Sequence, residues 1–230
     1  MDRFISLGFQ CVVPMILEDL GLRQNSYPFD WMLSTPKFVF EMLDLLLEKN
    51  ISTDELVKNH FFNFKDTARY VEPMEYYSLY RSDLSENDLT DLTHNEFLFN
   101  RKHNVIFPHD TYNNETIEKY IRRFDRLKEY IIDFESQIYF VYISESSLEL
   151  GSFRIDDKMI ISERHHWIYK IEKLISKFRK NFKIIYIDFT NSSETIENPN
   201  ITFIKTEPKD NWGFVRPVAT ELLREYNNNI

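Results

Sequence analysis

The stretch FKIIYIDF, residues 182 to 189, is an almost continuous run of apolar and aromatic side chains. A strand with one face in water alternates polar and apolar residues, whereas a run like this is typical of a strand buried on both faces. The runs IYFVYIS, residues 138 to 144, and ITFIKT, residues 201 to 206, have a similar character. A segment with helical spacing of its apolar residues, 166 to 178, lies between 144 and 182. The second half therefore predicts a mostly parallel sheet covered by helices.

Further helices and a strand are predicted before and after this region. Phe4 to Leu7 is a short apolar run, typical of a buried strand. Thr35-Pro36 has the features of a helix N-terminus, with a capping hydroxyl followed by proline at the first helical position. The other predicted helices are residues 12 to 20, ended by Gly21, and residues 36 to 48, 114 to 134 and 214 to 226.

This order of segments predicts an α/β fold, a Rossmann-like three-layer sandwich with a mostly parallel sheet. A chain of 230 residues is long enough for one large domain or two small ones. No linker or internal repeat divides the sequence, so we expect residues 1–230 to form a single domain. Residues 54 to 100 are rich in Tyr, Phe, Asn and Asp and are expected to be a less regular insertion.

Composition limits the partners and the compartment. A formal net charge of -9 and a pI near 5.2 argue against broad electrostatic binding to nucleic acid or to an anionic membrane. The single cysteine excludes an intrachain disulfide and favours a reducing compartment. No stretch approaches the ~18 apolar residues of a membrane span, and no leader is recognisable. A cytoplasmic protein is therefore expected.

Cys11, the only cysteine, lies where the first predicted strand leads into a helix, in the stretch SLGFQC. Gly8 would allow a tight turn there, and the amides at a helix N-terminus would favour a thiolate. The position also suits a small apolar side chain packed in the core. The residue types alone leave both interpretations open. No cofactor is expected, because SLGFQC lacks the further glycines of a dinucleotide-binding turn.

A nucleophilic thiol needs a base and a group that orients the base. His109 in FPHD, residues 107 to 110, lies beside the carboxylate of Asp110 at an expected element boundary, although it could equally be a turn residue with Asp110 as a cap. His165 and His166, at the start of a predicted helix, are expected to be surface or capping residues. The spacing of His, Cys, Asp and Glu shows no recognisable metal signature.

The stretch SYPFDW, residues 26 to 31, places Asp30 between two large aromatic residues. A carboxylate in such surroundings is expected to be partly buried and to need partners, which His109 or backbone amides could supply. The alternative is a purely structural role, in which Asp30 forms an Asx-type turn or caps the following helix.

Together, SLGFQC, GLRQNSYPFDWM, FPHD and RRFDRL resemble the pattern of an uncharacterised family whose members are described as papain-like cysteine peptidases. The likeness is strong over residues 3 to 34 and moderate over 104 to 145. It implies that Cys11 is the nucleophile and His109 the general base. Asp30 is the preferred third member of the catalytic set, with Asp110 and Asn211 as alternatives.

The resemblance also implies a papain-like α+β fold as the alternative to the α/β fold. In an α/β fold, the site is expected at the carboxyl ends of the strands. The implied activity is cysteine-dependent hydrolysis of a peptide or other amide, with a peptide or small molecule as substrate. In the alternative function the chain binds or transfers a sugar or nucleotide-like ligand, and Cys11 only packs. The residues expected to line the site are Ser6, Gly8, Gln10, Ser26, Trp31, Asp110 and Arg122.

Overall fold

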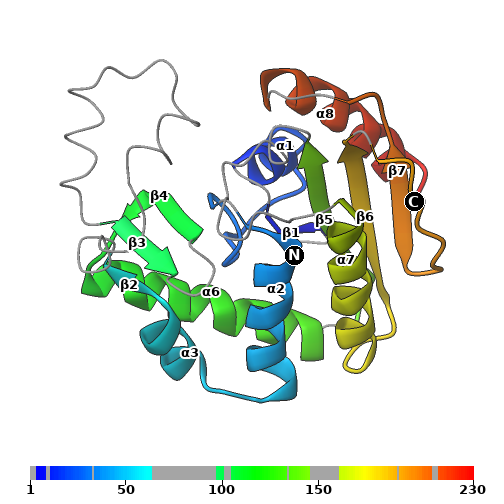
Figure 1. Cartoon of the computed structure of the whole chain (residues 1–230). Helices are drawn as coiled ribbons and strands as arrows, with labels where there is room; N and C mark the ends of the chain where they lie inside the picture. Colours follow the sequence, from blue (N-terminus) through cyan, green and yellow to red (C-terminus); the bar gives the residue numbers. More distant parts are fainter. Residues whose placement is uncertain are drawn as a thin grey trace, which may run out of the picture.

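The computed structural model describes residues 4–8, 11–32, 34–63, 97–100, 105–133, 135–145, 161–190, 192–208 and 212–230. The described strands form two sheets, a main sheet of four strands and a smaller sheet of three (Figure 1).

The main sheet is parallel throughout. Its strands are β1 (Phe4–Ser6), β5 (Ile138–Glu145), β6 (Phe182–Phe189) and β7 (Ile201–Lys205), in the order β1-β5-β6-β7. The parallel register pairs Phe4 with Tyr139 and Ile138 with Phe182. The prediction that the three apolar runs share one mostly parallel sheet is therefore confirmed, because each run forms the centre or the edge of this sheet.

Helices lie on both faces of the main sheet. On one face α7 (Ile161–Ser176) packs on β6 and β7, since the ring of His165 lies 5.6 Å from that of Tyr186 and 5.5 Å from that of Phe203. On the other face the ring of Tyr226, from α8 (Trp212–Asn228), lies 5.8 Å from that of Tyr139. Tyr139 and Tyr186 point to opposite faces because alternate strand residues do so. The arrangement is α/β, whereas the Rossmann-like comparison and the papain-like alternative stay predictions.

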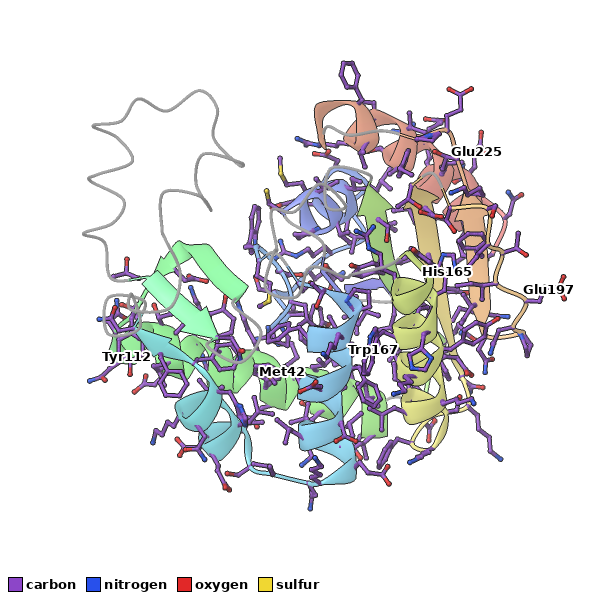
Figure 2. The ribbon with its side chains drawn as sticks, viewed as in Figure 1. Met42, Tyr112, His165, Trp167, Glu197 and Glu225 are labelled. Carbon is purple, nitrogen blue, oxygen red and sulfur yellow. The ribbon has the colours of Figure 1, made fainter. Side chains whose placement is uncertain are left out.

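Two further helices complete the two helical layers. α2 (Pro36–Leu43), which continues into the π-helical turn η1 (Asp44–Glu48), lies beside α7, with Phe40 and Trp167 in ring contact at 5.3 Å (Figures 1 and 2). α1 (Val12–Asp19) lies beside α8, where Arg216 donates to Asp19 at 2.6 Å. The predicted start of α2 is confirmed, since Thr35 Oγ1 accepts a hydrogen bond from the Phe38 amide at 3.2 Å and Pro36 follows it.

The smaller sheet is antiparallel and joins the main sheet by no ladder among the described strands. Its strands are β2 (Phe62–Asn63), β3 (Phe97–Asn100) and β4 (Val105–Thr111), in the order β2-β3-β4. Two helices pack together beneath it, α3 (Thr53–His60) and α6 (Asn114–Asp133) (Figure 1). The expected insertion at 54–100 thus contains α3, β2 and β3, while residues 64–96 lie outside the described part. The expected element boundary at His109 is wrong, because β4 continues through that residue.

Candidate active site

The turn after β1 requires glycine at position 8. Gly8 has φ +101°, and its amide donates to Ser6 Oγ at 3.0 Å. Ser34 Oγ donates to the Leu7 carbonyl at 3.2 Å, so the loop before α2 closes over this turn. A Cβ at position 8 would lie 1.6 Å from Ser34 Oγ, which leaves no space for any other residue. Ser6 and Gly8 therefore shape the turn at the carboxyl end of β1.

Cys11 follows this turn as the N-cap residue of α1. Its carbonyl accepts from the Met15 amide at 3.1 Å, and its side chain is partly buried. Burial raises the pKa of the Cys11 thiol, while its own backbone amide and the charge of Arg216 act in the opposite direction with less weight. The expected position at a helix N-terminus is confirmed. Among the described residues, desolvation outweighs the amide and the charge, and the lowering of the thiol pKa expected from a facing imidazole stays a prediction.

Asp30 is the anchor of the SYPFDW turn. The residue is 0% exposed, and its Oδ2 accepts from the Tyr27 amide at 2.9 Å and from Arg23 Nη2 at 2.8 Å. Burial raises the pKa of this carboxyl, and Arg23, the Tyr27 amide and Arg123 lower it in part. The expectation that Asp30 is buried and partnered is confirmed. These partners are an arginine and a backbone amide, as a turn-forming role predicts.

Ser26 and Trp31 lie at the two ends of the same turn. Ser26 Oγ accepts from Arg23 Nη2 at 2.8 Å, and its carbonyl accepts from Arg126 Nη1 at 2.6 Å. Trp31 has φ +61°, and the Arg23 guanidinium lies 5.8 Å from the centre of its ring. A bulky residue with positive φ is strained by about 1–3 kcal/mol, so the surrounding contacts must hold it in place.

The SYPFDW turn packs directly on the turn that precedes Cys11. The Phe29 carbonyl lies 3.3 Å from the point where a Cβ of Gly8 would be. Tyr142, near the carboxyl end of β5, donates through its hydroxyl to the Ser34 carbonyl at 3.3 Å. Two of the sequence motifs therefore meet over the carboxyl ends of β1 and β5, the edge where open α/β sheets bind ligands.

Asp110 connects β4 to α6. Its Oδ2 accepts from the Tyr120 hydroxyl at 2.6 Å, and its other oxygen pairs with Lys119. Burial and the nearby Asp110 carboxylate raise the pKa of Tyr120 well above its ordinary range. The Arg123 guanidinium lies 5.1 Å from the centre of the Tyr120 ring. The FPHD and RRFDRL motifs thus meet at this point.

Arg122, the arginine predicted to line the site, lies apart from this cluster. Its side chain is 62% exposed and stands 4.0 Å from Glu118. Its neighbour Arg123 is the buried member of the pair, at 9% exposure. The RR spacing indicated an arginine at the site, but only the helical phase of α6 determines which of the two faces inward.

Three predicted site residues lie wholly or partly outside the described part of the chain. Gln10 and Asn211 lie outside the described residues. The backbone of His109 lies in β4, and its side chain lies outside the described part. The proximity of His109 to Cys11 therefore stays a prediction.

A second buried polar cluster, at the carboxyl ends of β6 and β7, was missed by sequence reasoning. Asp188 is 0% exposed and accepts from Lys205 Nζ at 2.8 Å and from the Thr190 amide at 3.0 Å. His165 Nδ1 lies 2.9 Å from Glu194 Oε2, and its Nε2 lies 3.9 Å from Asp188 Oδ2. Figure 2 shows His165 where α7 meets the sheet. Together with the Ser144–Tyr186 hydroxyl pair at 2.9 Å, the cluster fills this edge of the sheet.

The expected surface position of His165 is wrong. α7 begins at Ile161, before the predicted start, and this places His165 on the inward face at 4% exposure. One residue in the sequence did indicate a buried partner at this place. Asp188 is a carboxylate near the end of an otherwise apolar strand, and a buried charge needs partners. A cationic or imidazole partner from a neighbouring element was therefore to be expected.

His165 does not serve Cys11 as a base in this arrangement. Cys11 follows β1, whereas His165 packs on β6 and β7, so at least two strand spacings, about 10 Å, separate them along the sheet. The two residues also belong to helices on different faces of the sheet, since α1 lies beside α8. This polar cluster is consequently distinct from the cysteine region.

Neither a metal site nor a membrane span is found in the described part of the chain. No three His, Cys, Asp or Glu side chains in these ranges are arranged to hold a metal ion. No helix of the described residues is long and apolar enough to cross a bilayer.

Comparison with known families agrees with the motif pattern. No curated protein and no solved structure shows a significant match to the chain. A family model described as "Putative papain-like cysteine peptidase (DUF1796)" matches residues 2–153, which include the turn before Cys11, the SYPFDW turn, β4 and α6. The chain belongs to this family.

Proposed function

We propose that the chain is a cysteine-dependent hydrolase that cleaves a peptide or another amide, with Cys11 as the nucleophile. The observation that supports this best is the position of Cys11. The only thiol in the sequence follows the carboxyl end of a parallel strand and begins a helix, inside the region matched by the family. Backbone amides at such a helix start are suitable donors to the oxyanion of an acyl-transfer reaction.

The raised thiol pKa determines which form of the mechanism we propose. A thiol that is neutral near pH 7 must lose its proton while it attacks, so a general base has to take that proton in the same step. We assign this role to His109. The sulfur then bonds to the acyl carbon, the proton passes to the departing amine, and the carbon–nitrogen bond breaks. Water, activated by the same base, hydrolyses the thioester and restores the thiol. Gln10 is our candidate for a second oxyanion donor.

Asp30 has a supporting part in this proposal. Its carboxylate is engaged by Arg23 and by the Tyr27 amide, so it holds the SYPFDW turn against Gly8. Asp110, which adjoins His109 in sequence, is engaged by Tyr120 and Lys119. Both carboxylates then act by fixing backbone segments, and Asn211 remains the alternative orienting group.

Labelling of the single cysteine tests the proposal. The folded protein is treated with an activated acyl ester, and the covalent adduct is measured by intact-mass spectrometry. Because the chain has one cysteine, Cys11→Ala must remove every thiol adduct. Removal of the base should slow acylation by about 100-fold, so His109→Ala should retain the thiol but react slowly. If the folded wild-type protein neither forms the adduct nor releases the alcohol of the ester, while the unfolded chain is fully labelled, the hydrolase is ruled out.

A second function is supported by the cluster of Ser144, His165, Asp188 and Lys205. Buried polar groups at the carboxyl edge of a parallel sheet suit a sugar or nucleotide-like ligand. If this is the function, Cys11→Ala should leave ligand affinity unchanged, whereas Asp188→Asn should reduce it. Calorimetric titration with sugars and nucleotides would measure both effects.

A further inference from the structure

We propose that Tyr120 and Arg123 of α6 are positioning residues for the cysteine site. They connect β4, the strand that carries His109, to the turn that packs on the Cys11 region. The inference rests on the proposed function, because it assumes that His109 assists Cys11. It adds two residues to the site that neither touch the thiol nor belong to the catalytic set.

The first connection joins α6 to β4. Tyr120 is fully buried, and its hydroxyl donates to Asp110 Oδ2 at 2.6 Å. A hydrogen bond of this length to a carboxylate is strong and directional. Asp110 follows His109 directly, so this bond fixes the backbone of β4 at the position next to the proposed base.

The second connection joins α6 to the SYPFDW turn. The charge of Arg123 acts on both Tyr120 and Asp30. Arg123 Nη1 and Asp30 Oδ1 are buried, and neither has a hydrogen-bond partner in the part of the chain that the structure describes. The Arg123 guanidinium lies 5.1 Å from the centre of the Tyr120 ring, and its positive charge favours the carboxylate form of Asp30. Arg123 thus links Tyr120 to Asp30 by its charge.

The third connection joins Asp30 to the turn before Cys11. Asp30 Oδ2 holds the Tyr27 amide, and the neighbouring Phe29 carbonyl lies against Gly8. The chain Asp110–Tyr120–Arg123–Asp30 therefore begins beside His109 and ends at the backbone that precedes Cys11.

The two sheets make such a connection necessary. The described strands of the small sheet share no ladder with the main sheet, so side-chain contacts must determine where β4 lies. Apolar contacts contribute, since the Phe61 ring lies 5.8 Å from Tyr120 and 6.0 Å from Phe124. These ring contacts tolerate small shifts, whereas the hydrogen bonds to carboxylates at the two ends of the chain, to Asp110 and to Asp30, fix direction and register. Buried charges often add little net stability, which is consistent with a role in geometry.

The matched variants are Arg123→Gln and Arg122→Gln, neighbouring residues of which one is buried and the other is exposed. The alkylation rate of Cys11 by iodoacetamide is measured against pH, together with the melting temperature. An assisting imidazole should give the wild type a step in the profile near pH ~6.5. We expect Arg123→Gln to remove this step and to slow alkylation below the thiol pKa by about tenfold, while Arg122→Gln keeps the wild-type profile.

A double variant separates positioning from general loss of stability. If Arg123 acts through His109, then His109→Ala combined with Arg123→Gln should react no more slowly than His109→Ala alone. Tyr120→Phe removes only the hydroxyl that holds Asp110, and we expect it to weaken the same step with little change in core volume. This variant also keeps the test decisive if Arg123→Gln does not fold.

Two outcomes would overturn different statements. A wild-type pH profile in folded Arg123→Gln or Tyr120→Phe, with the step lost in His109→Ala, would overturn the positioning role alone. A profile without a step in the wild type, unchanged by His109→Ala, would overturn the proposed function itself. In that case the polar chain would be a structural feature of the fold only.

Discussion

Gly8 is the residue on which the geometry of the cysteine region depends most directly. Its φ of +101° and the 1.6 Å that would separate an added Cβ from Ser34 Oγ are two independent reasons for glycine. We expect Gly8→Ala to lower the free energy of unfolding by about 3–5 kcal/mol, the sum of backbone strain and displacement of the Ser34 loop. Denaturant unfolding would measure the loss.

Gly21 provides the matched control for this prediction. It also has positive φ, +66°, but a Cβ there would meet nothing within 4 Å. Gly21→Ala should therefore lower the free energy of unfolding only by the backbone strain of a positive φ, about 1 kcal/mol. Equal losses for the two variants would show that the contact with Ser34 carries no weight.

The Cys11 thiol should titrate at higher pH in the folded protein than in the unfolded chain. Burial raises its pKa, so the neutral thiol persists as pH rises beyond the ordinary value of ~8.5. In His109→Ala, which lacks any imidazole contribution, the alkylation rate of the folded protein should reach its plateau only above that pH. The same protein in guanidinium should reach its plateau near the ordinary value. A folded thiol that reacts at lower pH than the unfolded one would contradict the balance described for Cys11.

At the scale of single residues, the sequence predicted local hydrogen bonds better than it predicted how deeply a side chain is buried. The Thr35 cap and the buried, partnered Asp30 were predictable, because the chemistry of a hydroxyl before proline and of a carboxylate between aromatics is local. The raised pKa of Cys11 and the burial of His165 were not. Both depend on how far neighbouring helices and strands cover the side chain. This coverage cannot be predicted from residue type and spacing.

Among the elements, α7 is fixed to the β6–β7 connection by one buried acid. Glu172 is 6% exposed, and its carboxylate accepts from Ser176 Oγ at 2.7 Å and from the side-chain amides of Asn200 at 2.8 Å and Asn198 at 3.2 Å. We expect Glu172→Ala to lower the free energy of unfolding by about 2–4 kcal/mol, because donors facing this side chain lose their acceptor. Glu172→Gln, which keeps one acceptor oxygen, should restore about half of that loss.

Glu197 is the control for this prediction. It belongs to the same connection but is exposed, and Figure 2 shows it at the outer edge of the molecule. Glu197→Ala should change stability by no more than about 0.5 kcal/mol. If Glu172→Ala had as small an effect, the β6–β7 connection would be held by its own turns and by other contacts with α7, such as the one between His165 and Glu194, instead of by Glu172.

Strand β4 shows why some elements escaped prediction. Its sequence, VIFPHDT, contains proline and three polar residues, and proline in a run argues against a central strand. The segment becomes a strand because β3 pairs with it through an antiparallel register that includes a shift between Phe97 and Leu98. Such a pairing is non-local, so no window of sequence predicts it. The strands of the main sheet were predictable because each apolar run indicates a buried strand by its own composition.

For the whole molecule, the parallel sheet was predicted from three apolar runs and the motifs were expected to converge on one site, but their connection through α6 was not predicted. SYPFDW, residues 26 to 31, lies far in the sequence from FPHD and RRFDRL, which fall within residues 107 to 127, and α6 connects the polar residues of these motifs. The site is therefore a product of topology, while each motif contributes only the chemistry of its side chains.

Three buried tyrosines should make the whole fold sensitive to alkaline pH. Burial raises the pKa of Tyr120, Tyr142 and Tyr186 above the ordinary value of ~10, so the native state binds protons that the unfolded chain releases. Their contribution to stability is fully present below that ordinary value and is lost as pH rises above it. We expect cooperative unfolding in this range, with a part of the phenolate absorbance at about 295 nm appearing only as the circular dichroism signal falls.

Tyr186→Phe should lower the free energy of unfolding by about 1 kcal/mol near neutral pH, because Ser144 loses its hydrogen-bond partner. At alkaline pH the same variant should show a weaker dependence of the free energy of unfolding on pH, because one tyrosine fewer releases its proton on unfolding. Its stability curve should therefore approach that of the wild type as pH rises, and parallel curves would show that Tyr186 ionises within the folded protein.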